Sequence, residues 1–91
     1  MTSIPATEIA HFHYPSFDVL QDEQARLNRL IDLNSAMAVT NIEHEEIGII
    51  VQLRDGQEVE ILSNLIDVED DSVEVKGGHL IPIRAILRVE N

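Results

Sequence analysis

Only a few side chains in this sequence have the types and spacing that chemistry requires, and two histidines come first. His11 and His13 are separated by one residue, so an extended segment would present both imidazole rings on one side. Imidazole is a common ligand of transition metals, but such sites need three or four converging ligands. Because this spacing supplies two, we predict no metal site and no cofactor, and a metal- or ligand-binding protein is a lesser alternative.

The remaining candidate motifs are explained better by turns than by catalysis. The acidic run of Glu69, Asp70 and Asp71 lacks the glycine and the distal glutamate of a calcium-binding loop. Gly77 and Gly78 do not open a helix, as the glycines of a phosphate-binding loop do, and they favour a hairpin turn. The chain has no cysteine, and no serine has a nearby base pattern. The sequence therefore predicts a non-enzyme.

The charge of the chain indicates the kind of partner that it could bind. Seventeen acidic residues against six basic ones give a formal charge of −11. A field of this sign repels phosphate backbones and anionic lipids, and it attracts basic protein surfaces. Acidity also keeps a small protein soluble, and this simpler explanation stays open. We predict a protein partner with a basic surface, and no direct binding of nucleic acid or membrane.

Size and composition predict one domain over residues 1–91. The chain is 44% hydrophobic, which suffices for one core but not for a deep active site. The absence of cysteine fits a reducing compartment. No apolar run approaches the ~20 residues of a membrane-spanning helix, and the first residues lack the features of a signal segment. We therefore expect a soluble, cytoplasmic protein.

Residues 47–61 contain the clearest structural signal, a β-hairpin. Asp55 and Gly56 favour a type I′ turn, in which both residues take positive φ. Apolar and polar residues alternate on both sides of this pair, as in strands with one buried face. The residues expected to face the core are Ile47, Ile49, Val51, Leu53, Val59 and Ile61.

Residues 22–39 have the periodicity of an amphipathic helix. Asp22 and Glu23 place negative charge in the first turn, where the helix dipole favours it. Thr40 and Asn41 are expected to end the helix. An apolar stripe on one face is expected to pack on the sheet that follows. This stripe comprises Leu27, Leu30, Ile31, Asn34, Met37 and Ala38.

The rest of the chain alternates between short strands and turns. The second strand of the hairpin is expected to run on and to bend near Ser63 and Asn64. Further elements are expected as a turn at 69–72, strands at 72–76, 79–83 and 86–89, and a 3₁₀ turn at 84–85. This order predicts an α+β, mostly β fold: an N-terminal helix followed by a five-stranded antiparallel Sm-like or SH3-like small barrel over residues 47–90. An open four-stranded meander with a helix on one face is the alternative.

Residues 1–21 form an arm that holds all three aromatic residues of the chain. Burial of a large apolar side chain contributes about 1.5–3 kcal/mol, which an unpacked arm would forgo. The arm is expected to pack over its own domain, to dock on a partner, or to become ordered in an oligomer. Together with the acidic faces, it supplies the candidate partner-binding residues Phe12, Tyr14, Phe17, Glu58, Glu60, Glu69, Asp70 and Asp71.

Four segments from Leu27 to the end carry a resemblance to known families: LNSAMA, VQLRDGQEVEI, LIDVEDDSVEV and GGHLIPIRAILRVE. In this order they resemble the YolD-like family of small bacterial proteins, which implies a link to translesion polymerase or mobile-element operons. The second half also resembles the Rof-type modulators of transcription termination. That resemblance implies an acidic Sm-like barrel with one helix, which covers a basic nucleic-acid-binding surface of the factor Rho. Both resemblances imply a non-enzymatic protein with a protein partner.

Three functional hypotheses follow from these observations. The favoured one is an acidic protein-interaction module that docks on a basic surface of a nucleic-acid-processing enzyme. The second is a self-assembling Sm-like structural oligomer, whose subunits pair their edge strands. The third is a metal- or ligand-binding protein in which His11 and His13 converge with carboxylates.

Overall fold

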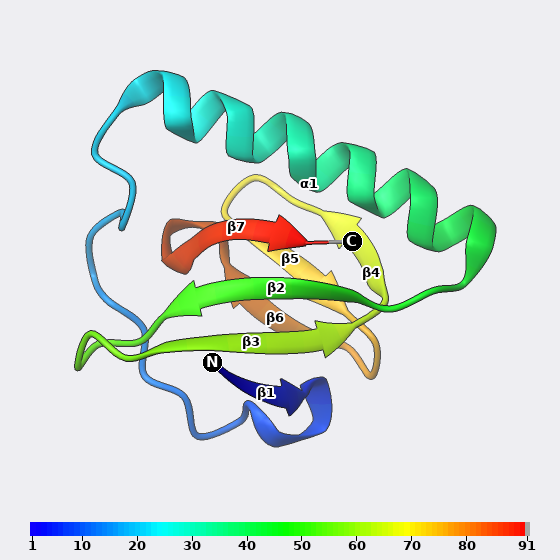
Figure 1. Ribbon diagram of the computed structural model, residues 1–91, viewed down its shortest axis with the longest axis horizontal. Coiled ribbons are helices and arrows are strands. Elements are labelled where there is room, and N and C mark those ends of the chain that lie inside the picture. Colours follow the sequence, from blue (N-terminus) through cyan, green and yellow to red (C-terminus); the bar gives the residue numbers. More distant parts are fainter. Residues whose placement is uncertain (91) are drawn as a thin grey trace.

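One long helix lies across two small β-sheets in a computed structural model of the protein, which describes residues 1–90 (Figure 1). The elements are β1 (Thr2–Pro5), the 3₁₀ turn η1 (Ala6–Glu8), α1 (Glu23–Glu43), β2 (Ile47–Gln52), β3 (Glu58–Ser63), β4 (Leu65–Val68), β5 (Ser72–Val75), β6 (His79–Pro82), the 3₁₀ turn η2 (Ile83–Ala85) and β7 (Ile86–Glu90). The first sheet has the order β1-β3-β2-β7, and the second has the order β4-β5-β6. The predicted α+β class is therefore confirmed.

Two details of the predicted architecture differ from the structure. The two sheets do not close into a barrel, and the helix lies in mid-chain because strand β1 precedes it. This strand pairs in parallel with β3, and Ile4 in it packs against the core. The segment predicted to be an arm that packs on its own domain, docks on a partner or becomes ordered in an oligomer thus begins as an edge strand of the first sheet. Four residues are too few to show a clear alternation of apolar and polar positions.

The β2–β3 hairpin is confirmed, but its turn is not of the predicted type I′. Gly56 N–H donates to the Leu53 carbonyl (2.9 Å), and Gly56 alone in this turn has a positive φ, of 91°. Asp55 Oδ1 accepts a hydrogen bond from Gln57 N–H (2.9 Å) instead. The left-handed position falls on glycine because a side chain there would be strained. Of the hairpin residues expected to face the core, five are buried and Leu53 is half-buried; the buried five are Ile47, Ile49, Val51, Val59 and Ile61. Ile50 is buried as well, so β2 is covered on both faces and not on one as predicted.

The predicted bend at the end of β3 is confirmed, and it joins three parts of the fold. Only Asn64 separates β3 from β4. Lys76 N–H lies within hydrogen-bonding distance of both Ser63 Oγ (3.2 Å) and the Asn64 carbonyl (3.3 Å). Thr40 Oγ1 on α1 donates to the Leu65 carbonyl (2.9 Å). The bent strand therefore holds both sheets and the helix in one core.

The remaining β elements lie close to their predicted positions. Strands β5, β6 and β7 follow in the expected order, and η2 provides the expected 3₁₀ turn. Gly77 and Gly78 both have positive φ, 90° and 80°, as the predicted tight turn requires. Strand β7 returns to pair with β2, which places the last strand beside the first strand of the hairpin.

Helix α1 begins where the sequence predicts and ends later. Asp22 Oδ2 accepts a hydrogen bond from Ala25 N–H (3.1 Å), as expected of a helix N-cap. At the other end His44 takes a left-handed conformation, with φ of 60°, and its N–H donates to the Thr40 carbonyl (2.8 Å). The prediction that Thr40 and Asn41 end the helix is wrong because Thr40 is buried against β4.

The face of α1 that contacts the sheets differs from the predicted stripe, of which Met37 alone packs against the core. Its buried residues are Arg29, Leu33, Ala36 and Thr40, and they pack toward β4 and β7. Leu27, Leu30 and Ile31, which were expected in the core, are exposed. The helix is anchored by Arg29, whose Nη1 donates to the Ile86 carbonyl (3.0 Å). Because Arg29 faces the sheets and is buried there, the Leu27 side of the helix faces solvent.

Candidate interaction surfaces

The aromatic arm is divided between the core and the surface. Phe12 and Tyr14 are half-buried against the core, and their rings meet edge to face with centroids 6.4 Å apart. Arg54 N–H donates to the His13 carbonyl (2.8 Å), which ties the arm to the hairpin. Phe17 is 59% exposed. Two of the three predicted partner-binding aromatics thus pack on their own domain, and only Phe17 is freely accessible.

The two histidines border a shallow cavity at the hairpin end of the molecule. Its volume is about 390 Å³, and its lining residues are His11, Phe12, His13, Leu53, Arg54 and Asp55. Both histidine side chains are exposed. Within residues 1–90 no group of three His, Cys, Asp or Glu side chains is arranged to hold a metal ion. The cavity is lined by both apolar and polar side chains but has no convergent set of three metal ligands among the described residues.

The predicted acidic residues on β3 have different roles. Glu58 is exposed at the start of the strand. Glu60 is half-buried, and its Oε1 accepts a hydrogen bond from Ser3 Oγ (2.6 Å) on β1. Its side chain lies over Gly48 on β2, where a Cβ would overlap the carboxylate. Glu60 therefore helps to hold the edge strand, whereas Glu58 is available to a partner.

The second acidic group lies in the turn between β4 and β5, in the other sheet. Glu69, Asp70 and Asp71 are all exposed. Ser72 Oγ donates a long hydrogen bond to Glu69 Oε2 (3.4 Å), and the Asp71 carbonyl accepts one from Ile83 N–H (2.9 Å). The three carboxylates thus project from a turn whose backbone is fixed. The structure does not join them to the β3 acids in one cluster.

Most of the acidic charge is uncompensated within the described chain. Only Asp18 and Glu90, of the seventeen acidic residues, form ion pairs in residues 1–90. Their partners are Arg26 and Arg29 for Asp18, and Arg88 for Glu90. Fifteen carboxylates therefore contribute to a negative surface field without a neighbouring cation.

An exposed apolar ridge runs along α1, and sequence reasoning assigned much of it to the core. We define the apolar ridge as Leu27, Leu30, Ile31, Ala38, Val39 and Ile42. Leu27, Ile31 and Ile42 are 51%, 54% and 77% exposed. The helical period locates this stripe correctly, but it cannot tell which of two faces is buried. The sequence signal for the buried face was a second apolar pair, Leu33 and Ala36, on the opposite side of the helix.

Two further findings concern the helices and the comparisons with known proteins. None of the helices in residues 1–90 combines the length and apolar character needed to cross a membrane. Comparisons of the chain with family models, with curated proteins and with solved structures find no match.

Proposed function

We propose that this chain is a small non-enzymatic interaction module that binds a basic surface of another protein. The observation that carries the proposal is the uncompensated charge: fifteen carboxylates without an ion-pair partner on a chain of 91 residues. Complementary charge speeds the encounter of two proteins and suppresses binding to acidic competitors. Glu58 and the exposed turn of Glu69, Asp70 and Asp71 are the residues best placed to contact such a partner.

The strand order supports a relation to small Sm-like barrels. Strand β2, the bent β3–β4 pair, β5, β6, η2 and β7 follow one another, and β7 returns to β2. We propose that the two sheets form an opened version of such a barrel. The resemblance to YolD-like and Rof-type proteins then extends the proposal: the basic partner is an enzyme or factor that processes nucleic acid.

Affinity capture at two salt concentrations tests the proposed function. The tagged full chain serves as bait at about 0.1 M and about 0.5 M salt, because added salt screens exposed charges. The matched bait carries Glu69→Gln, Asp70→Asn and Asp71→Asn. We expect one enriched basic protein that is lost at high salt and reduced with the neutralised bait. Partners whose capture depends neither on the salt concentration nor on the three neutralising substitutions would contradict electrostatic docking.

Open sheet edges favour self-assembly as a second candidate function. Strands β1 and β7 end the first sheet, and β4 and β6 end the second. Unpaired strand edges can pair with another chain, although Pro82 removes one backbone donor from β6. Size-exclusion chromatography with light scattering decides between the two functions. A monomer at every concentration excludes assembly through these edges.

A further inference from the structure

The apolar ridge of α1 is long and free of charged residues, and the polar residues Asn34 and Ser35 interrupt it near its middle. Its central row of Leu27, Ile31, Ala38 and Ile42 extends from residue 27 to residue 42, about 22 Å along a helix that rises 1.5 Å per residue. Asn34 lies between these residues, and its Nδ2 donates to the Leu30 carbonyl (2.9 Å). The side-chain amide of Asn34 therefore has a hydrogen-bond partner within the helix.

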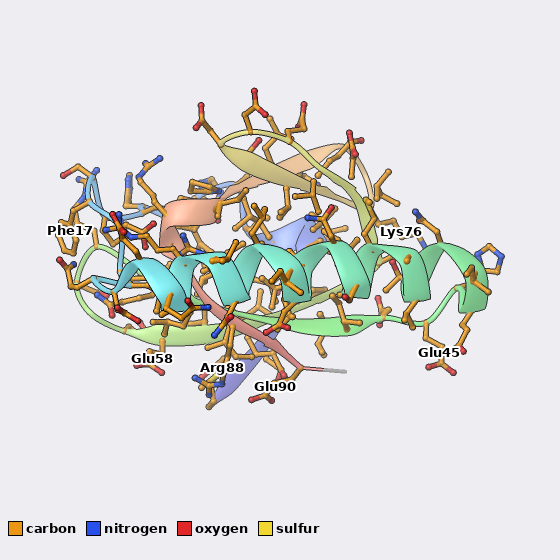
Figure 2. The ribbon with its side chains drawn as sticks, turned by 90° about the horizontal axis from the view of Figure 1, so that it is seen from above. Phe17, Glu45, Glu58, Lys76, Arg88 and Glu90 are labelled. Carbon is orange, nitrogen blue, oxygen red and sulfur yellow. The ribbon has the colours of Figure 1, made fainter. Side chains whose placement is uncertain are left out.

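The surroundings of the ridge are strongly acidic. The helix with its two ends (22–46), β4 with the following turn (65–71) and β7 together hold eleven acidic residues and three arginines. These are the segments that contact α1 or continue from it. Figure 2 looks down on the helix, with Glu45 near its C-terminal end and Glu90 along one flank. We call these eleven carboxylates the acidic rim; they lie on the helix, at its two ends and on the segments packed against its buried side.

Among the described residues, the arginines of this region form an ion pair with one rim carboxylate only, that of Glu90. Arg26 and Arg29 are both paired with Asp18, at 3.5 Å and 2.7 Å. Arg88 is paired with Glu90 at 3.0 Å, and Figure 2 shows the two side chains next to each other beside the helix. Lys76 is the nearby cation without a salt bridge among residues 1–90, and it lies toward the C-terminal half of α1.

We propose that the apolar ridge binds an amphipathic helix of a partner protein, whose apolar face of about four turns is flanked by lysine and arginine. The apolar face would cover Leu27, Ile31 and Ile42, and the flanking cations would meet the acidic rim. This inference rests on the proposed function and specifies both the surface and the chemistry of the partner. It predicts affinity from apolar burial and selectivity from charge.

A second copy of this chain fits the ridge less well than a basic helix does. Each copy carries a formal charge of −11, so self-pairing would place two acidic rims against each other. The occupant favoured by the charge is a basic helix from another protein.

Binding of a model peptide tests the inference directly. The probe is a fluorescein-labelled peptide of about 18 residues, with leucines on one helical face and lysines on the other. Fluorescence anisotropy follows its titration with the full chain and with the triple variant Leu27→Gln, Ile31→Gln, Ile42→Gln. We expect the triple variant to bind at least about tenfold more weakly, without a change in helical circular dichroism.

The matched control removes an equally exposed apolar side chain from another element. Leu80 on β6 is 55% exposed, and Leu80→Gln is expected to bind the peptide within about twofold of the unmodified chain. Three results would overturn the inference: equal binding by the triple variant, equal binding of a leucine–glutamate peptide, or a stable dimer that the triple variant dissociates. If affinity capture yields a salt-sensitive partner that the triple variant retains, the proposed function stands and this inference alone fails.

Discussion

Arg29 donates two parallel hydrogen bonds to Asp18, from Nη1 to Oδ1 at 2.8 Å and from Nη2 to Oδ2 at 2.7 Å. Arg29 is 6% exposed, and the same Nη1 also reaches the carbonyl of Ile86 on β7. One side chain thus joins the segment before the helix, the helix itself and the last strand. Charge-assisted bidentate pairs of this kind fix geometry as well as adding energy.

Replacement of Asp18 by asparagine should destabilise the fold. Asp18→Asn leaves the Arg29 guanidinium buried without its counter-charge, at a cost of about 3 kcal/mol in the free energy of unfolding. The control is Asp32→Asn, at an exposed position on α1 without a salt bridge, where a change within about 0.5 kcal/mol is expected. Urea denaturation at neutral pH measures both. Equal effects of the two substitutions would contradict this role.

The same pair should make stability depend on pH in the acid range. Burial raises the pKa of Asp18, but the hydrogen bonds from Arg29 and Leu20 N–H and the charges of Arg29 and Arg26 outweigh this and lower the pKa below its usual value. The contribution is present above the unfolded pKa of about 3.9 and is lost as pH falls through the folded pKa. The stability difference between the unmodified chain and Asp18→Asn should therefore shrink in acid. A difference that stays constant down to pH ~2 would exclude the linkage.

Tyr14 should titrate far above the usual range of tyrosine. Burial raises the pKa of Tyr14 to about 12, and its hydroxyl has no hydrogen-bond partner among the described residues. Tyr14 is the single tyrosine of the chain, so absorbance at the phenolate band reports it alone. We expect a midpoint well above 10 while circular dichroism is still native, and a midpoint near 10 in denaturant.

The Tyr14 shift also predicts the direction of alkaline destabilisation. Because the pKa of Tyr14 is raised in the folded state, its titration leaves the free energy of unfolding undiminished below the unfolded pKa of about 10. Above that value the free energy of unfolding decreases as pH rises toward the folded pKa. Tyr14→Phe removes an unpartnered hydroxyl, so it should leave stability at pH ~8 unchanged or raise it by up to about 1 kcal/mol. It should also abolish this part of the alkaline loss. Marked destabilisation by Tyr14→Phe would show that the hydroxyl is bonded.

Gly48 and Glu60 should behave as a coupled pair. A Cβ at position 48 would displace the Glu60 side chain and break its bond to Ser3, at a cost of about 1 kcal/mol. In a Glu60→Ala background the same Gly48→Ala change should be neutral or stabilising, because alanine loses less backbone entropy than glycine. A double-mutant cycle measured by urea denaturation gives the coupling. Additive effects would mean that the two residues act independently.

The two faces of α1 should respond very differently to truncation. Leu33 has no exposed surface, and Leu33→Ala is expected to cost about 2–5 kcal/mol through lost burial and a cavity. Ile31→Ala, two residues earlier, is expected to cost less than about 1 kcal/mol because Ile31 is 54% exposed. Thermal and urea unfolding of the two variants compare the faces. A large loss from Ile31→Ala would assign the ridge to the core instead.

The sequence predicts the β elements well because their signals are local. Alternation over residues 47–61 and the glycine pair at Gly77 and Gly78 specify faces and turns without knowledge of the rest of the fold. The buried face of α1 escapes such reasoning because it includes Arg29, which reads as a surface residue. Its partner Asp18 lies eleven residues away in sequence, in a segment with no periodic pattern. The parallel pairing of β1 with β3 is non-local in the same sense.

The candidate site is predictable only in part. Net charge indicates the acidic surface, and Glu58 and the β4–β5 turn are exposed as such a surface requires. The aromatic residues cannot be assigned from the sequence because Phe12 and Phe17 have the same chemistry, yet one packs against the core and the other faces solvent. The apolar ridge depends on which way the helix is turned. That orientation is held jointly by the Arg29–Asp18 pair, the packing of Leu33 and Ala36, and the Thr40 hydrogen bond to β4.

The parallel pairing of β1 with β3 also bears on how the chain folds during synthesis. Ser3 and Glu60, joined by a hydrogen bond across the two strands, are 57 residues apart in sequence. The ribosome therefore releases β1 well before its partner strand exists, and translation at about 5–20 residues per second imposes a delay of seconds. Throughout that interval β1 has no β3 to pair with. The pairing of β1 with β3 can therefore form only after the β2–β3 hairpin has been synthesised.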